Sequence, residues 1–271
     1  DGQRLFYSGD FRGHGRKAKL FDRLVADPPP EVDALLMEGT TLDPAREDRP
    51  YPTEDDLEAQ FLSAFQETRG LSLVWASGQN IDRLVTIFRA AKRAGRVLIV
   101  DLYTAAILTA TGNAHIPQSH WPEMRVFLPQ GQRIHVKNQR LFDTLKAHAV
   151  NRIYGEALQD LAPRAVMLFR PSLRRGLEKF DCLNGSALIY SLWSGYLKLE
   201  KTQPILTWLE AKSIPLSHIH TSGHASTADL QRLAAAINPR QLVPIHSFAT
   251  ERFPGLFANV SPKQDGEWWG V

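Results

Sequence analysis

One stretch near the end of the chain carries the clearest pattern of secondary structure: residues 216–246 read LSHIHTSGHASTADLQRLAAAINPRQLVPIH. Apolar residues at spacings of three and four predict a helix over Thr227–Ile237. The apolar runs Leu216–Thr221 and Gln241–Ile245 on either side of it predict two strands. A strand, a helix and a second strand in this order indicate an α/β architecture.

The same alternation runs through the rest of the chain. Further strands are predicted at Leu5–Ser8, Ala34–Met37, Leu71–Ala76, Val97–Asp101, Ala165–Phe169 and Ala187–Trp193. Further helices are predicted at Glu54–Thr68, Ile81–Ala94, Gln139–His148 and Pro204–Lys212. This order places the chain in the α/β class, with at least one largely parallel sheet. Residues 111–135 lack such a pattern, and we interpret them as an irregular surface loop.

A boundary between structural regions is predicted at residues 43–52, DPAREDRPYP, because this segment is rich in proline and charge. The chain begins with Asp1-Gly2, a turn signal of two-residue hairpins, followed by a predicted strand. A hairpin also needs a strand before its turn. We therefore expect the chain to be the C-terminal part of a longer protein.

Composition excludes several classes of protein. With 43% hydrophobic and 23% charged residues among 271, the chain has the composition of a globular protein rather than a disordered one. The net charge of +3 permits a polyanionic partner without requiring one. The single cysteine, Cys182, excludes an internal disulfide and a CxxC metal site, so a reducing cytoplasm is the predicted location. No apolar run has the length that crosses a bilayer, and we expect no membrane partner.

Four short motifs follow predicted strands, which is where α/β folds bind their ligands. They are SGDFRGHGRK (8–17), LLMEGTT (35–41), HTSGHAS (220–226) and PIHSF (244–248). The first two deliver carboxylates: Asp10 is placed to ligate a metal ion, and Glu38 to orient a histidine. Taken alone, Asp10 is better explained as a residue that caps its loop, and Glu38 is explained equally well as an ordinary turn acid.

The last two motifs carry histidines. His220, Ser222 and His224 precede a helix whose capping box opens with Ser226, and a helix N-terminus attracts anions. These side chains are therefore candidates for binding phosphate, with a structural histidine pair as the alternative. His246 follows an apolar strand, from which it can either ligate a metal or serve as a core residue.

Together and in this order, the four motifs resemble the C-terminal motif series of the metallo-β-lactamase/β-CASP family of RNA-processing metallohydrolases, and are most similar to its ribonuclease J-like branch. The resemblance implies the C-terminal part of a metallo-β-lactamase αββα sandwich, formed by residues 1–52 and 213–271. An α/β β-CASP domain would be inserted between them over residues 53–212. It also implies zinc-dependent hydrolysis of RNA phosphodiester bonds, with two zinc ions in the intact enzyme.

The resemblance also assigns roles to particular residues. It implies the metal ligands Asp10 and His246, the catalytic residues His224 and Glu38, and the phosphate- or RNA-binding residues His220 and Ser222. In the catalytic pair, the histidine would face the scissile phosphate and the glutamate would orient a neighbouring histidine.

One part of the family pattern is absent. The HxHxDH signature, which supplies most of the metal ligands, occurs nowhere in the chain. Two ligands cannot complete a tetrahedral zinc site, so we expect this chain alone to be inactive and to hold no zinc tightly. Two alternatives stay open: a DNA nuclease of the same superfamily acting on single-stranded DNA, and a non-catalytic nucleic-acid-binding subunit. The sequence does not determine whether the chain forms a homodimer.

Overall fold

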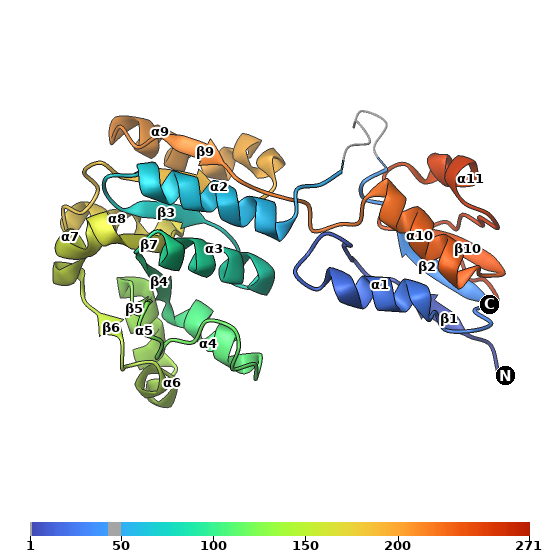
Figure 1. The fold of residues 1–271 in the computed structure, drawn as a ribbon, viewed down its shortest axis with the longest axis horizontal. Coiled ribbons are helices and arrows are strands. Elements are labelled where there is room, and N and C mark those ends of the chain that lie inside the picture. Colours follow the sequence, from blue (N-terminus) through green and yellow to red (C-terminus); the bar gives the residue numbers. More distant parts are fainter. Residues whose placement is uncertain (1, 43–49) are drawn as a thin grey trace. The chain divides into compact units, whose positions relative to one another are not determined.

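The structure, a computed structural model, describes residues 2–42 and 50–271. The chain divides into two compact units (Figure 1): unit 1 comprises Asp1–Thr53 and Thr221–Val271, and unit 2 comprises Glu54–His220. The expected turn residue Asp1 and most of the expected boundary segment 43–52 lie outside the described residues.

Unit 1 contains a parallel sheet with the strand order β1-β2-β10. Its elements are β1 (Leu5–Tyr7), α1 (Ala18–Ala26), β2 (Ala34–Glu38), α10 (Thr227–Ile237), β10 (Gln241–Ile245) and α11 (Phe253–Leu256). One apolar cluster joins the sheet to its helices through buried side chains such as Leu35, Leu233 and Leu242. Because the strands are parallel, their carboxyl ends lie at the same edge of the sheet, and Ile245 pairs with Glu38 there.

Helix α10 begins and ends as the sequence predicts. The Ser226 hydroxyl accepts a hydrogen bond from the Asp229 N–H at 3.1 Å, which caps the first turn. Asn238 ends the helix in the left-handed conformation, and Pro239 follows it. Strong local signals at both ends therefore fix the helix that precedes β10.

Unit 2 contains a seven-stranded parallel sheet with the order β6-β5-β4-β7-β3-β8-β9. Its strands are β3 (Ser72–Trp75), β4 (Val97–Asp101), β5 (Met124–Phe127), β6 (Arg152–Ile153), β7 (Ala165–Leu168), β8 (Ala187–Tyr190) and β9 (Leu216–His218). Its α-helices are α2 (Glu54–Glu67), α3 (Ile81–Arg93), α4 (Leu102–Ala110), α5 (Gln130–Asn138), α6 (Phe142–Ala147), α7 (Leu158–Leu161), α8 (Arg174–Lys179) and α9 (Gln203–Ala211).

Both faces of this sheet are buried. Val100 belongs to an apolar cluster with side chains of α2, α3 and α4, whereas its neighbour Ile99 belongs to a second cluster with side chains of α7, α8 and α9. Neighbouring residues of a strand point to opposite faces, so a sheet covered on both sides requires continuous apolar runs. The VLIV run of β4, residues 97–100, is such a sequence.

The interpretation of residues 111–135 as an irregular loop was wrong over part of its length. Strand β5 lies within this segment, and α5 begins there. Met124 and Val126 face one apolar cluster and Phe127 the other, so the strand is buried between β4 and β6. Four residues are too few to show a periodic pattern. The position of β5 is set by its pairing with the neighbouring strands β4 and β6.

The second predicted boundary differs from the observed division. Residues 213–220, expected in the third segment, lie in unit 2, because β9 pairs with β8 from Leu188–Leu216 to Tyr190–His218. The α/β class itself is confirmed. Within the described residues, no helix combines the length and apolar character that spanning a bilayer requires.

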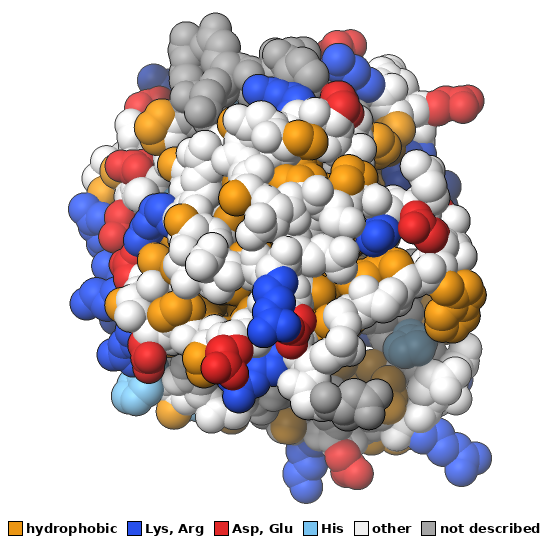
Figure 2. Space-filling view, turned by 90° about the vertical axis from the view of Figure 1, so that its right-hand side faces the viewer, with side chains coloured by type: hydrophobic (Ala, Val, Ile, Leu, Met, Phe, Trp, Pro, Cys, Tyr) orange, Lys and Arg blue, Asp and Glu red, His pale blue; other side chains and the backbone are white. Residues whose placement is uncertain are grey.

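The surface of unit 1 carries apolar side chains that stay exposed, including Tyr7, Phe248 and Trp268. Figure 2 shows one face of the molecule on the side of unit 1, where apolar side chains lie among polar and charged ones. Scattered apolar residues of this kind are normal on protein surfaces.

Candidate active site

Three parallel strands bring the predicted site residues of unit 1 together. Asp10 follows β1 after a turn at Gly9, whose φ of 56° is readily adopted by glycine. Glu38 is the last residue of β2, and His246 comes directly after β10. His224 lies in the loop that leads into α10.

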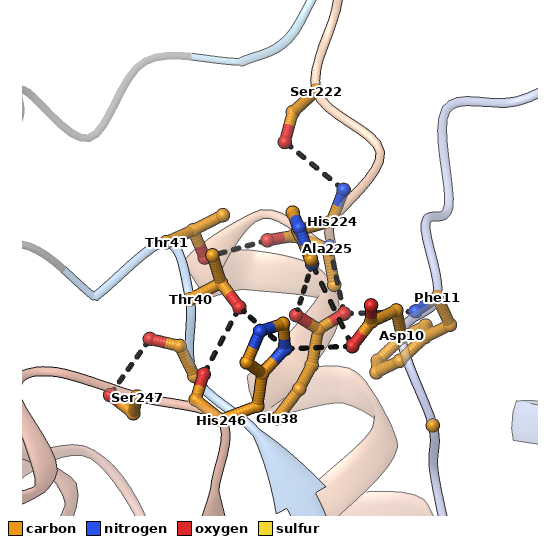
Figure 3. Close-up of polar contacts among 12 residues, drawn as sticks. Asp10, Phe11, Glu38, Thr40, Thr41, Ser222, His224, Ala225, His246 and Ser247 are labelled. Atoms are coloured by element: carbon orange, nitrogen blue, oxygen red, sulfur yellow. Dashed lines mark hydrogen bonds and ion pairs between the residues drawn. The ribbon is translucent and has the colours of Figure 1, made fainter. Parts of the chain in front are cut away.

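The four side chains form one cluster (Figure 3). Each of the residues Asp10, Glu38, His224 and His246 offers one potential ligand atom, and these atoms lie within 4.8 Å of one another. His246 Nδ1 lies 2.9 Å from Asp10 Oδ1, and His224 Nδ1 lies 2.7 Å from Glu38 Oε2. The cluster therefore consists of two carboxylate–histidine pairs.

Glu38 is almost completely buried, with its side chain 1% exposed. Oε1 accepts the N–H of Phe11 at 2.9 Å, and Oε2 accepts Nδ1–H of His224. The two carboxylate oxygens are thus occupied by donors from other segments of unit 1. A carboxylate bound in this way can hold the ring of the histidine in one orientation. The structure contains the histidine hydrogen bond that the sequence predicts for Glu38.

The same hydrogen bond governs the chemistry of His224. The bond to Glu38 raises the pKa of His224 above its ordinary value; burial lowers it, and the negative charges of Glu38 and Asp10 raise it further. A raised pKa favours the imidazolium form, which carries a proton on each ring nitrogen. Because Nδ1 is bound to Glu38, Nε2 is the ring nitrogen that remains available for another partner.

Asp10 and His246 are the two members of the cluster suited to hold a metal ion. Their side chains are 55% and 58% exposed, and a carboxylate oxygen and an imidazole nitrogen are both zinc ligands. Ligand atoms at 2.0–2.1 Å from a tetrahedral zinc ion lie about 3.3 Å apart, close to the 2.9 Å observed here. His246 has a φ of 47°, an uncommon backbone conformation for a residue other than glycine, often found at functional sites. The pair fits zinc but supplies only half of a tetrahedral shell.

We therefore expect the 271-residue chain alone to bind zinc weakly, with less than one ion per chain after dialysis. Asp10 and His246 offer two ligand atoms, whereas structural and catalytic zinc sites use three or four protein ligands. Elemental analysis of the purified chain measures this directly. About two tightly held zinc ions per chain would contradict the assignment of Glu38 and His224 to non-ligating roles.

His220 is the last residue of unit 2. Burial lowers its pKa to about 4; the charges of Arg83 and His218 lower it further, and a hydrogen bond with the backbone of Ser191 acts in the opposite direction. Its Nδ1 atom is buried without a hydrogen-bond partner among the described residues. His224 thus belongs to the cluster of unit 1, whereas His220 belongs to unit 2.

The depressed pKa of His220 is measurable. Its ring signals in an NMR titration should have a midpoint near pH 4 rather than near 6.5. Because the unfolded chain binds this proton at higher pH, the neutral ring contributes stability above about pH 6.5, and this is lost as the pH falls towards 4. His220→Gln should accordingly reduce the fall in Tm between pH 7 and pH 5. A midpoint at pH 6 or above would contradict the burial of this ring.

Ser222 occupies a rigid turn beside the cluster. Its hydroxyl accepts the His224 N–H at 3.0 Å. Its carbonyl accepts a hydrogen bond from Arg12 at 3.3 Å and lies 2.9 Å from His14 Nε2. Arg12 and His14 thus connect the loop of Asp10 with the loop of His224. Sequence reasoning did not assign them a role, although both stand in the motif that contains Asp10.

Sequence reasoning also assigned no role to Thr40. Its hydroxyl donates to the carbonyl of His246 at 3.0 Å and lies 3.3 Å from Nδ1 of the same residue. This contact supports the left-handed conformation of His246. The only sequence signal was its place in the Gly39-Thr40-Thr41 turn after Glu38.

The start of α10 differs from the free anion site that the sequence predicts. The Ser226 hydroxyl accepts the Asp229 N–H and donates to the Asp229 carboxylate at 3.0 Å. The first turn therefore already holds a negative charge, which is unfavourable for a second anion.

Comparisons with known proteins give a match to a family model and a match to a solved structure. Residues 215–247 match a family described as "Zn-dependent metallo-hydrolase RNA specificity domain". A solved structure entitled "Crystal Structure of a Protein of Unknown Function from Enterococcus faecalis V583" superposes with a TM-score of 0.73 at 22% sequence identity. The match covers 97% of this chain and 57% of that one, so the chain spans little more than half of its length. No curated protein matches the chain.

The class that the matched family model describes is a metal-dependent hydrolase. The match over residues 215–247, which contain His224 and His246, confirms the resemblance to the metallo-β-lactamase/β-CASP family that the four motifs predict.

Proposed function

We propose that this chain supplies the phosphate-facing part of the active site of a zinc-dependent ribonuclease. The observation that carries the proposal is the hydrogen bond from His224 to the buried Glu38, beside the exposed pair of Asp10 and His246. One pair is arranged for proton transfer and the other for metal binding. The RNA specificity of the family matched by residues 215–247 supports RNA as the substrate.

The chemistry follows from this division of roles. The two zinc ions of the intact enzyme, partly held by Asp10 and His246, would supply an activated water. As the water oxygen bonds to phosphorus, the bond from phosphorus to the leaving ester oxygen breaks. His224 donates its Nε2 proton to that leaving oxygen, while Glu38 holds Nδ1–H and so fixes the orientation of the ring. The remaining zinc ligands come from groups outside this cluster.

We further propose contacts with the substrate by Ser222 and His220. The Ser222 hydroxyl accepts from the His224 backbone, so its own proton remains for a phosphate oxygen. A contact by His220 would have to use the neutral ring, because its pKa of about 4 leaves it uncharged at neutral pH. In this proposal unit 1 is part of the metallo-β-lactamase domain, unit 2 is the inserted β-CASP domain, and the protein acts on cytoplasmic RNA.

The test uses the complete natural protein with zinc and a labelled single-stranded RNA oligonucleotide. We expect cleavage that is lost on chelation and restored by zinc. A single-stranded DNA of the same sequence serves as the matched substrate. Cleavage of DNA but not of RNA would favour the DNA nuclease, and no cleavage of either strand by the zinc-loaded protein would favour a non-catalytic subunit.

A further inference from the structure

Exposed aromatic side chains are concentrated at one edge of the unit 2 sheet. Among the described residues of unit 2, five large aromatic side chains are exposed: Tyr103, Phe142, Tyr154, Trp193 and Tyr196. All except Phe142 follow the carboxyl end of a strand, namely β4, β6 or β8. Because the whole sheet is parallel, these ends share one edge, which we call the aromatic edge and define by Tyr103, Tyr154, Trp193 and Tyr196.

Trp193 is the most exposed member of this edge, at 61%. Its six-membered ring lies over Gly195, where a Cβ atom would come within 2.3 Å of the indole. Tyr196 meets it edge-on, with ring centroids 5.2 Å apart and an interplanar angle of 88°. The indole is therefore supported by backbone and by a second ring while most of its surface faces solvent.

The backbone under this pair is well anchored. The Tyr196 N–H donates to the Trp193 carbonyl at 3.1 Å, and the Thr202 hydroxyl donates to the Tyr196 carbonyl at 2.8 Å. The Tyr190 hydroxyl, at the end of β8, reaches the Trp193 carbonyl at 3.4 Å. A rigid aromatic surface loses little conformational entropy when a flat ligand stacks on it.

Cations accompany the aromatic rings along this edge. The Arg152 guanidinium lies 4.8 Å from the ring centre of Tyr154, and that of Arg170 lies 5.6 Å from the ring centre of Tyr103. Arg170 is held there by Asp101 at 2.6 Å. Lys198 stands two residues after Tyr196 in the same helical turn. Interleaved aromatic and basic side chains are the pattern by which proteins bind unpaired bases and their phosphates.

We propose that the aromatic edge binds single-stranded RNA, with one unpaired base stacked on Trp193. Strands β4 and β8 stand three strand spacings apart in the sheet, about 14 Å, so the edge has room for several nucleotides. Bases within a duplex are already stacked and paired, which excludes duplex RNA from this contact. The choice of RNA rests on the proposed function, whereas the stacking itself follows from the geometry of unit 2.

Binding of a fluorescently labelled oligoadenylate of eight nucleotides to the 271-residue chain tests the proposal, with chelator present so that no strand is cut. Trp193→Ala should weaken binding about 5-fold to 100-fold, the loss expected for one stacked base. Trp193→Phe keeps an aromatic face and should recover most of the affinity. Gly195→Ala keeps the indole but displaces it, and should weaken binding as well.

Phe142→Ala is the matched control, because Phe142 is exposed to 56% but is the first residue of α6 and does not follow the carboxyl end of a strand. It should bind the oligonucleotide as the wild type does. Binding by Trp193→Ala at wild-type strength, or an equal loss in Phe142→Ala, would overturn the proposal. Failure of the wild-type chain to bind the oligonucleotide would also overturn it and would favour a protein partner at this edge.

The outcome separates this proposal from the proposed function. Binding is measured without zinc, so it does not depend on hydrolysis by the catalytic cluster of unit 1. Absence of RNA hydrolysis together with Trp193-dependent binding would refute the ribonuclease and keep the RNA-binding edge. RNA hydrolysis together with wild-type binding by Trp193→Ala would support the ribonuclease and refute the RNA-binding edge.

Discussion

His224→Ala should slow RNA hydrolysis by about 10²-fold to 10⁴-fold, the contribution of a general acid, while the zinc content stays close to that of the wild type. Nδ1 of His224 is bound to Glu38 at 2.7 Å, which fixes the orientation of the ring, and the proposed function assigns its Nε2 to proton transfer. Turnover of single-stranded RNA and elemental analysis of the same preparation of the complete protein measure the two effects together.

Two further variants test the role of Glu38 and provide a control. Glu38→Gln keeps the shape of the side chain but weakens its hold on the histidine, and should cost about 10-fold to 100-fold in turnover. His120→Ala removes an exposed histidine of unit 2 and should leave turnover unchanged. A His224→Ala protein with normal turnover would remove the proposed role of this residue in proton transfer.

His246→Ala should lose both zinc and activity. Nδ1 of His246 lies 2.9 Å from the Asp10 carboxylate, and no other histidine is paired with that carboxylate so closely among the described residues. Removing one ligand of a zinc site weakens the site as a whole, so hydrolysis should fall to background at ordinary zinc concentrations. A zinc titration followed by activity would show whether excess metal restores part of the rate.

The matched control is Phe248→Ala, two residues further along the same loop, where the side chain is fully exposed. This variant should keep its zinc and its activity. Equal loss of zinc in His224→Ala and His246→Ala would show that the roles of the two histidines are wrongly divided.

Much of the secondary structure could be predicted, because its signals are local. Strands Val97–Asp101 and Gln241–Ile245 and helix Thr227–Ile237 have the observed bounds. The helix combines a clear period with a cap, and the two strands are short apolar runs bounded by turn residues. Strands β5 and β6 were missed because they are short and owe their place to neighbouring strands. No local sequence pattern indicates that these two strands pair with their neighbours in the sheet.

The candidate site was predictable as a set of residue types but not as an arrangement. The four motifs in their order resembled those of the metallo-β-lactamase/β-CASP family, and the metallohydrolase class came from that resemblance. The pairing of Asp10 with His246, 236 residues apart in the chain, depends on the order β1-β2-β10. Strand order follows from burying whole sheet faces together, and one short motif does not contain that information.

His220 and His224 show which features the sequence determines and which only the tertiary structure decides. The sequence by itself determined the α/β class, the helix after Ser226 and the presence of both histidines near its start. Only the tertiary structure separated them: β9 pairs with β8 and holds His220 in unit 2, and the chain enters unit 1 at Thr221. His224 then meets Glu38, which is buried in unit 1. Local periodicity is set by neighbours in the chain, whereas the partner of a side chain is set by which strands pack together.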